Sequence, residues 1–166
     1  MKDLSILVPS YNMEKYLPKC LGSLVVAPEL MDRLEVLVVN DGSKDRTSEI
    51  AHEFAAKWPG AFRVIDKPNG NYGSCINAAL PVATGKYVKV LDADDSFDTD
   101  SFAAYLQFLD GIPTVDLVIA DFDVVDENGV VTVRRTYELD RDREFTIEDF
   151  VQRRPDVSMH ALTYRT

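Results

Sequence analysis

The stretch KYVKVLDADDSFDTD (residues 86–100) runs from an apolar segment of strand character into a cluster of acids. Asp92, Asp94 and Asp95 follow directly on the expected strand. Carboxylates this close repel one another, and they stay ionised together only when a positive charge lies among them. Asp98 and Asp100 are interpreted as acids in the first turn of a following helix, where they favour the helix dipole. The sequence therefore predicts a bound cation beside Asp92, Asp94 and Asp95.

Other short β-branched segments have the same character and are separated by helical patterns. They are LSILVP (4–9), RLEVLVVN (33–40), FRVID (62–66) and DLVIADF (116–122). Apolar spacing predicts helices within residues 13–25, 50–58, 74–85 and 99–111, with Pro18 near the start of the first one. Strict alternation of strand and helix predicts an α/β fold whose open, doubly wound, mostly parallel sheet is flanked by helices.

The alternation stops after Phe122. Residues 124–139 have the pattern of a β-hairpin whose turn is Asp126 to Gly129, and TIEDFVQRR (146–154) predicts a short helix with a capping box at Thr146 and Asp149. We therefore divide the chain into an α/β domain of residues 1–122 and a second region, 123–166, which we expect to be truncated.

Composition excludes several functional classes. A net charge of −10 over 166 residues argues against binding of nucleic acid. No apolar run approaches the roughly 20 residues that span a bilayer, and the N-terminus lacks a secretory signal. We therefore expect a cytoplasmic chain with no membrane segment. This expectation includes a chain that acts at the cytoplasmic face of a membrane. Cys20 and Cys75 show no metal-binding spacing and are expected to be reduced core residues.

Polar motifs follow three of the expected strands: PSYN (9–12), NDGS (40–43) and DADD (92–95). Since the carboxyl ends of parallel strands meet at one edge of the sheet, these motifs can converge on one ligand. Asp41 can accept hydrogen bonds from a base or ribose, and Tyr11 offers a ring for stacking. Taken alone, residues 41–43 are better explained as a turn that starts a helix, which Asp, Gly and Ser favour, and only the neighbouring motifs give them functional weight.

The acids that follow residue 91 suit Mg²⁺ or Mn²⁺, which bind through one or two carboxylates together with ligand phosphates. The spacings of an EF-hand, a P-loop and a Gly-x-Gly-x-x-Gly fingerprint are all absent. Gly70 and Gly73 precede a helix, and two interpretations stay open for them: a flexible loop, or a loop that closes over a sugar or its phosphates.

Taken together, SILVPSYNMEKYLPKCLGSL (5–24), EVLVVNDGSKDRT (35–47), NGNYGSCINAAL (69–80) and ATGKYVKVLDADD (83–95) resemble the family 2 glycosyltransferases. These are inverting enzymes of the GT-A fold that use nucleotide-diphospho-sugars. The resemblance spans residues 4–98 and implies a nucleotide-sugar site in the α/β domain. The residues that it assigns to nucleotide-sugar binding are Pro9, Tyr11, Asn12, Asp41, Gly70, Asn77 and Asp92, with Asp41 on the base, Asp92 near the ribose, and residues 70–77 beneath the donor.

The resemblance also implies a metal and a reaction. Asp94 is the expected ligand of Mg²⁺ or Mn²⁺, and Asp95 a second one. The reaction would transfer a sugar, with inversion, to a hydroxyl of a carbohydrate or lipid-linked acceptor in polysaccharide biosynthesis. A UDP-sugar is the commonest donor, although GDP- and dTDP-sugars fit the sequence equally well. We expect residues 123–166 to begin the acceptor side and the general base to lie beyond Thr166.

Two alternatives to this function remain open. One is a non-catalytic module that binds nucleotide sugars, because an intact metal motif supports binding more directly than turnover. The other is a nucleotidyltransferase, which is disfavoured because VPSYNMEKY (8–16) is not the Gly-rich, Arg- or Lys-bearing loop expected directly after the first strand.

Overall fold

The fold comes from a computed structural model, which describes residues 2–112, 114–137, 145–146, 148–149 and 157–166. The chain forms two compact units, Met1–Asp116 with Tyr164–Thr166, and Leu117–Thr163. No helix in the described ranges combines the length and apolarity needed to cross a bilayer.

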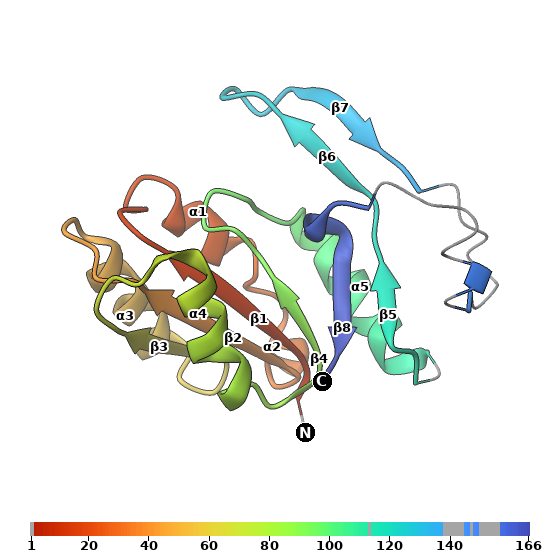
Figure 1. The fold of residues 1–166 in the computed structure, drawn as a ribbon, viewed down its shortest axis with the longest axis horizontal. Helices are drawn as coiled ribbons and strands as arrows, with labels where there is room; N and C mark the ends of the chain where they lie inside the picture. The colour runs from red at the N-terminus through yellow and green to blue at the C-terminus, as the bar shows by residue number, and fades with distance from the viewer. Residues whose placement is uncertain (1, 113, 138–144, 147, 150–156) are drawn as a thin grey trace. The chain divides into compact units, whose positions relative to one another are not determined.

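The first unit is built on strand β1 (Lys2–Ser10), which is parallel to β2 (Leu34–Asn40) on one side and to β4 (Gly85–Val90) on the other. Strand β3 (Phe62–Asp66) extends the sheet beyond β2. The strand order is β3-β2-β1-β4 (Figure 1). The chain adds β2 and then β3 on one side of β1, and it then crosses over to add β4 on the other side of β1. This reversal is a topological switch point between the carboxyl ends of β1 and β4, where open α/β sheets bind ligands. The predicted doubly wound, mostly parallel sheet is confirmed.

The helices of the first unit follow the predicted alternation. Helix α1 (Leu17–Gly22) carries Pro18 in its first turn, as expected, and α5 (Thr99–Gly111) is capped by Asp98, whose carboxylate accepts from the Ser101 N–H at 2.9 Å. Short helix α2 (Pro28–Met31) has no counterpart in the predicted pattern. The remaining helical elements are α3 (Thr47–Lys57), α4 (Asn71–Ala79) and the 3₁₀ turn η1 (Leu80–Val82).

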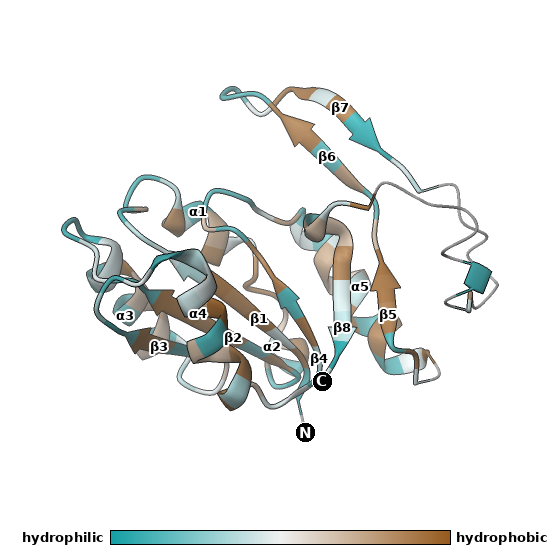
Figure 2. Cartoon of the chain, in the orientation of Figure 1, coloured by the Kyte–Doolittle hydropathy of each residue, from teal (hydrophilic) through white to brown (hydrophobic). Residues whose placement is uncertain are grey.

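The core of this unit lies on both faces of the central strands. Every residue from Leu4 to Ser10 in β1 and all of β2 are buried, which requires cover on both faces of the sheet. Helix α4 lies across the near side of β1 and β2, and the strands beneath it are strongly apolar (Figures 1 and 2). The cluster between α4 and the sheet consists of Leu7, Leu37, Val39, Cys75, Ala79 and Val88.

Strand β8 (Leu162–Arg165) crosses the boundary between the units. Its Tyr164 and Arg165 pair antiparallel with Val88 and Tyr87 of β4, so this edge departs from the parallel pattern. The sequence did not predict this strand.

The second unit contains β5 (Leu117–Ile119), the 3₁₀ turn η2 (Met159–Ala161) and a hairpin of β6 (Phe122–Val125) and β7 (Val131–Arg135). The predicted hairpin is confirmed, since Asp126 Oδ1 accepts from the N–H groups of Asn128 and Val130, both at 2.9 Å. Thr146 and Asp149 make the reciprocal hydrogen bonds of a capping box, although most of the predicted helix 146–154 lies outside the described residues.

A buried carboxylate holds the amino-terminal end of the sheet together. Glu35, only 4% exposed, accepts hydrogen bonds from Ser5 Oγ (2.6 Å), the Thr84 N–H (2.8 Å) and Arg63 Nη1 (3.2 Å). Burial acts to raise the pKa of Glu35, but the bonds from Ser5 and Thr84 and the charge of Arg63 outweigh it, so the pKa lies below the usual value. Glu35 is therefore ionised in the folded protein and joins β1, β2, β3 and the start of β4.

Glu35 predicts a pH dependence of stability. Because its pKa is lowered on folding, its contribution is present above the unfolded value near 4.5 and is lost as pH falls through the folded pKa. We expect Glu35→Gln to lower the free energy of unfolding by about 1 to 3 kcal/mol at pH 7. Urea denaturation between pH 7 and pH 3 should show a smaller difference between the variant and the parent at the acid end. The exposed Glu127→Gln is the control, and a difference that does not shrink with acid would contradict this role.

Gly85 provides a second test, because the backbones of β1 and β4 approach closely beside it. A Cβ at this position would lie 2.5 Å from the Ser5 backbone nitrogen and 2.7 Å from the Leu4 carbonyl carbon. We expect Gly85→Ala to lower the free energy of unfolding by about 2 to 3 kcal/mol, since backbone atoms cannot move aside locally. Gly22→Ala is the matched control, because its Cβ would meet no described atom within 4 Å. Equal effects of both substitutions on urea denaturation would show that the strands have room to separate.

Candidate functional site

The loop after β1 is bound to the loop before α3. The Asn12 N–H donates to Ser43 Oγ (3.1 Å), Asn12 Oδ1 accepts from the Lys44 N–H (2.8 Å), and the Met13 N–H donates to Thr47 Oγ1 (2.7 Å). Asn12 has a φ of +54°, a left-handed conformation that Asn tolerates better than most residues. The PSYN and NDGS motifs thus form one connected rim at the carboxyl ends of β1 and β2.

Asp41 is the buried anchor of this rim, with only 2% of its surface exposed. Its Oδ1 accepts from the Lys67 ammonium and from the Gly70 N–H (2.9 Å). Lys67 Nζ also donates to Ser74 Oγ (2.8 Å), which lies on α4. Burial acts to raise the pKa of Asp41, but the Lys67 and Gly70 bonds and the Lys67 charge lower it below its usual value. The carboxylate is therefore ionised and fixes the start of α4 beside the end of β2.

The acids after β4 form a tight turn. The Asp95 N–H donates to the Asp92 carbonyl oxygen (3.0 Å), and carboxylate oxygens of Asp92 and Asp95 lie within 4.8 Å of each other. Tyr72, from the first turn of α4, donates its hydroxyl to Asp92 Oδ1 at 2.7 Å. The turn is thus linked to α4 on one side, while Cys20 Sγ of α1 lies 3.8 Å from the Asp92 carbonyl oxygen.

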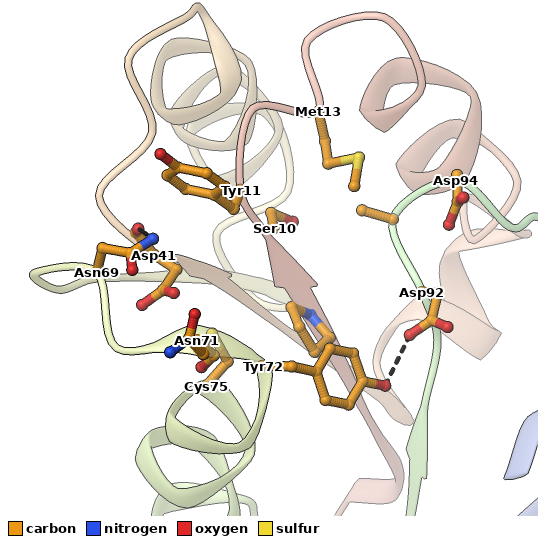
Figure 3. A pocket seen from close by; sticks show the side chains of 12 residues that line it. Ser10, Tyr11, Met13, Asp41, Asn69, Asn71, Tyr72, Cys75, Asp92 and Asp94 are labelled. Atoms are coloured by element: carbon orange, nitrogen blue, oxygen red, sulfur yellow. Dashed lines mark hydrogen bonds between the residues drawn. The ribbon is translucent and has the colours of Figure 1, made fainter.

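These segments enclose a pocket of about 420 Å³ at the switch point (Figure 3). The rings of Tyr11 and Tyr72 stand on different sides of it and are 45% and 44% exposed. Asp41 lies at one end, and Asp92 and Asp94 lie at the other. The lining residues are Pro9, Ser10, Tyr11, Met13, Asp41, Asn69, Asn71, Tyr72, Cys75, Asp92, Ala93 and Asp94.

The acidic turn produces a negative potential that reaches neighbouring groups. Burial raises the pKa of Cys20 to about 12, and the charges of Asp95, Asp94 and Asp92 add to that rise. Lys89 on β4 is only 4% exposed; burial lowers its pKa to about 8, and the charge of Asp95 opposes this change. Lys89 is therefore a basic group of the protein that lies near the acids.

The sequence-predicted site residues occupy different positions around the pocket. Five of them line it: Pro9, Tyr11, Asp41, Asp92 and Asp94. Asn12 uses its side chain to hold the Lys44 N–H, and Gly70 donates its N–H to Asp41. Asn77 is exposed on α4, and Asp95 lies beside Asp92; neither is among the lining residues.

Sequence reasoning assigned no role to Lys67 and no individual role to Tyr72, which lies within the segment 70–77 that it placed beneath the donor. Both make hydrogen bonds to predicted site residues, across 26 and 20 positions of the chain respectively. A lysine just after a strand and a tyrosine at a helix start carry no distinctive local pattern. Only the fold reveals their partners.

The acidic turn fits a hard divalent cation. Mg²⁺ and Mn²⁺ take carboxylate oxygens and retain sites for water or phosphate, so they need few protein ligands. Asp92 and Asp95 offer oxygens within 4.8 Å of each other, and Asp94 projects from the same turn at the pocket. This donor set suits either ion.

The family model for glycosyl transferase family 2 matches residues 5–163. The chain belongs to this family. It is 33% identical over 108 residues to the minor teichoic acid biosynthesis protein GgaB of Bacillus subtilis, a match that covers 65% of this chain and 12% of GgaB. The chain spans about a third of the length of the first curated family 2 relatives that it matches.

Two solved structures of glycosyltransferases share the fold. S. aureus TarS 1–349, in complex with UDP-GlcNAc, is 32% identical with a TM-score of 0.57, over 66% of this chain and 31% of that one. The mannosyltransferase PcManGT from Pyrobaculum calidifontis, in complex with GDP-Man and Mn²⁺, is 28% identical with a TM-score of 0.61, over 74% of this chain and 35% of that one. These neighbours confirm the expected GT-A fold.

The role of Asn12 in this family 2 site can be tested by substitution. Asn12→Ala removes the acceptor for the Lys44 N–H and strains a left-handed backbone, whereas Asn12→Gly removes only the acceptor. We expect the alanine variant to lose about 1 kcal/mol more stability than the glycine variant in urea denaturation. Asn12→Asp keeps an acceptor and should stay closest to the parent. The same loss in the alanine and glycine variants would mean that the backbone at this position is unstrained.

Proposed function

We propose that the chain binds a nucleotide-diphospho-sugar at the β1/β4 switch point and acts within an inverting glycosyltransferase. The observation that carries this proposal is the pocket, which has a stacking ring and a buried carboxylate at one end and an acidic turn at the other. Membership of family 2 supports sugar transfer, and the two neighbouring structures contain UDP-GlcNAc and GDP-Man.

In the proposed complex the base stacks on Tyr11 and donates an N–H to Asp41. The carboxylate is suited to this because it is ionised, so it is an acceptor only. Pro9 and Asn12 shape the base end of the pocket, and Gly70 and Asn77 belong to the segment beneath the donor. Asp92 accepts a hydrogen bond from the ribose.

Asp94 and Asp95 are the proposed ligands of Mg²⁺ or Mn²⁺. When bound, the ion would neutralise negative charge on the diphosphate oxygens of the donor and leaving group. Support comes from the carboxylate of Asp95, which lies beside Asp92 in the turn, from the position of Asp94 at the pocket, and from the Mn²⁺ in the PcManGT complex. In a chain of net charge −10, an anionic donor needs such a counter-charge.

The proposed reaction is an in-line displacement. An acceptor oxygen forms a bond to the anomeric carbon from the face opposite the diphosphate, and the bond from that carbon to the diphosphate oxygen breaks, which inverts the configuration. A carboxylate base removes the proton of the acceptor hydroxyl. We place this base outside residues 1–166 and regard 123–166 as the start of the acceptor side. The acceptor is a carbohydrate or a lipid-linked molecule. The similarity to GgaB, a teichoic acid biosynthesis protein, favours a role in the synthesis of a cell-surface polymer.

The donor site can be tested by ligand-induced stabilisation. We expect either UDP or GDP, in preference to ADP and dTDP, to raise the melting temperature of the purified chain only when Mn²⁺ or Mg²⁺ is present. At 100 times the dissociation constant the stabilisation is about 2.7 kcal/mol, a readily measured shift. Asp94→Ala should lose the shift, because the diphosphate then lacks part of its counter-charge.

Asp100→Ala is the matched control, since this exposed acid lies in the first turn of α5 and should leave the shift intact. Metal-dependent hydrolysis of UDP-GlcNAc or GDP-Man would separate an enzyme from a binding module. The proposal fails if no diphosphate stabilises the parent chain, or if Asp94→Ala and Asp100→Ala behave alike.

A further inference from the structure

One hydrogen bond links the two ends of the pocket. Tyr72 stands at the start of α4, and its hydroxyl donates to Asp92 Oδ1 at 2.7 Å (Figure 3). Its ring lines the pocket and is 44% exposed, so the side chain is not simply a core residue. A half-exposed tyrosine that bonds a carboxylate inside a ligand pocket has a geometry suited to ligand binding as well as to stability.

The position of Tyr72 is set by the buried anchor at the other end. Asn71, directly before it, has a φ of +66° and begins the helix. The preceding Gly70 N–H donates to Asp41, and Lys67 bridges Asp41 to Ser74 of the same helix. The first turn of α4 is therefore fixed on both sides, and Tyr72 reaches Asp92 from a rigid base.

The bond also restricts what Asp92 can do. Tyr72 is the donor and Asp92 Oδ1 the acceptor, so this bond favours one orientation of the Asp92 carboxyl group. Burial first, and then the bond to Asp92 and its charge, raise the pKa of Tyr72 above its ordinary value, so the phenol keeps its proton near neutral pH. One oxygen of Asp92 is thus held toward α4.

We propose that Tyr72 is a positioning residue of the donor site, whose hydroxyl holds Asp92 in the orientation that accepts a ribose hydroxyl. This inference rests on the proposed nucleotide-sugar function and extends it to a residue to which sequence reasoning assigned no individual role. Tyr72 acts through Asp92 rather than on the reacting atoms.

The test compares ribose with deoxyribose. Titration calorimetry with Mn²⁺ would measure the binding of UDP and GDP, and of their 2′-deoxy and 3′-deoxy forms, to the parent chain and to Tyr72→Phe, which keeps the ring. We expect Tyr72→Phe to weaken binding of the preferred ribonucleotide about tenfold, in line with a lost charge-assisted contact. Binding of the deoxy form that lacks the contacted hydroxyl should stay the same in both proteins.

A double-mutant cycle separates positioning from packing. In an Asp92→Asn background, Tyr72→Phe should have a smaller effect than in the parent, since the amide oxygen that remains is a weaker acceptor both for the Tyr72 hydroxyl and for the ribose. Tyr16→Phe is the matched control: Tyr16 is similarly exposed, and it does not line the pocket. This control should leave the preference for ribose over deoxyribose unchanged.

Each other outcome has a definite meaning. If Tyr72→Phe weakens the ribose and deoxyribose forms equally, the hydroxyl acts on a part of the nucleotide other than the contacted ribose hydroxyl, and the inference is wrong. Unchanged binding in the variant, or full additivity with Asp92→Asn, overturns it as well. If the parent chain binds neither UDP nor GDP, the proposed function itself fails.

Discussion

Parallel pairing of β1 on both of its edges is the constraint on which the rest of the first unit depends. Because β2 and β4 flank it in the same direction, their carboxyl ends lie together at one edge of the sheet. The close approach at Gly85 and the buried Glu35 fix the opposite end. With that end fixed, the loops after the strands are free to carry polar side chains without weakening the core.

The loops at the ligand edge are themselves fixed by buried or partly buried polar contacts. Asn12 joins the first loop to the second, and the Asp41–Lys67 pair joins the second to α4. Tyr72 then joins α4 to the acidic turn. The pocket is therefore surrounded by a continuous series of hydrogen bonds, which is the kind of preorganisation that a site for a flexible nucleotide sugar requires. The two ends of the pocket, at Asp41 and at the acidic turn, are connected through the start of α4.

Electrostatics sets the condition under which so acidic a site could hold the proposed anionic donor. Burial first, and then the charges of Asp95, Asp94 and Asp92, raise the pKa of Cys20, so the field of these acids extends into the core. The charge of Asp95 also acts on the buried Lys89. A divalent cation at the turn would reverse the local sign and create a place for a diphosphate. Asp41 differs from these acids because Lys67 already neutralises it. Aspartate therefore has two roles in this pocket. Asp41 is paired with Lys67 inside the protein, whereas the acids of the turn are suited to a bound cation.

The sequence by itself determined the strand and helix alternation, the three polar motifs at strand ends and the hairpin turn, because each depends on residues close together in the chain. It placed Asp98 in the first turn of α5, whereas the structure makes Asp98 the N-cap of that helix. The family could also be identified from motif spacing. The tertiary structure alone decided the antiparallel pairing of β8, the hydrogen bond between Asn12 and Lys44, and the partners of Lys67 and Tyr72. These contacts join residues 20 or more positions apart, and their geometry depends on where the crossovers place each helix start. Local sequence patterns carry no information about that placement.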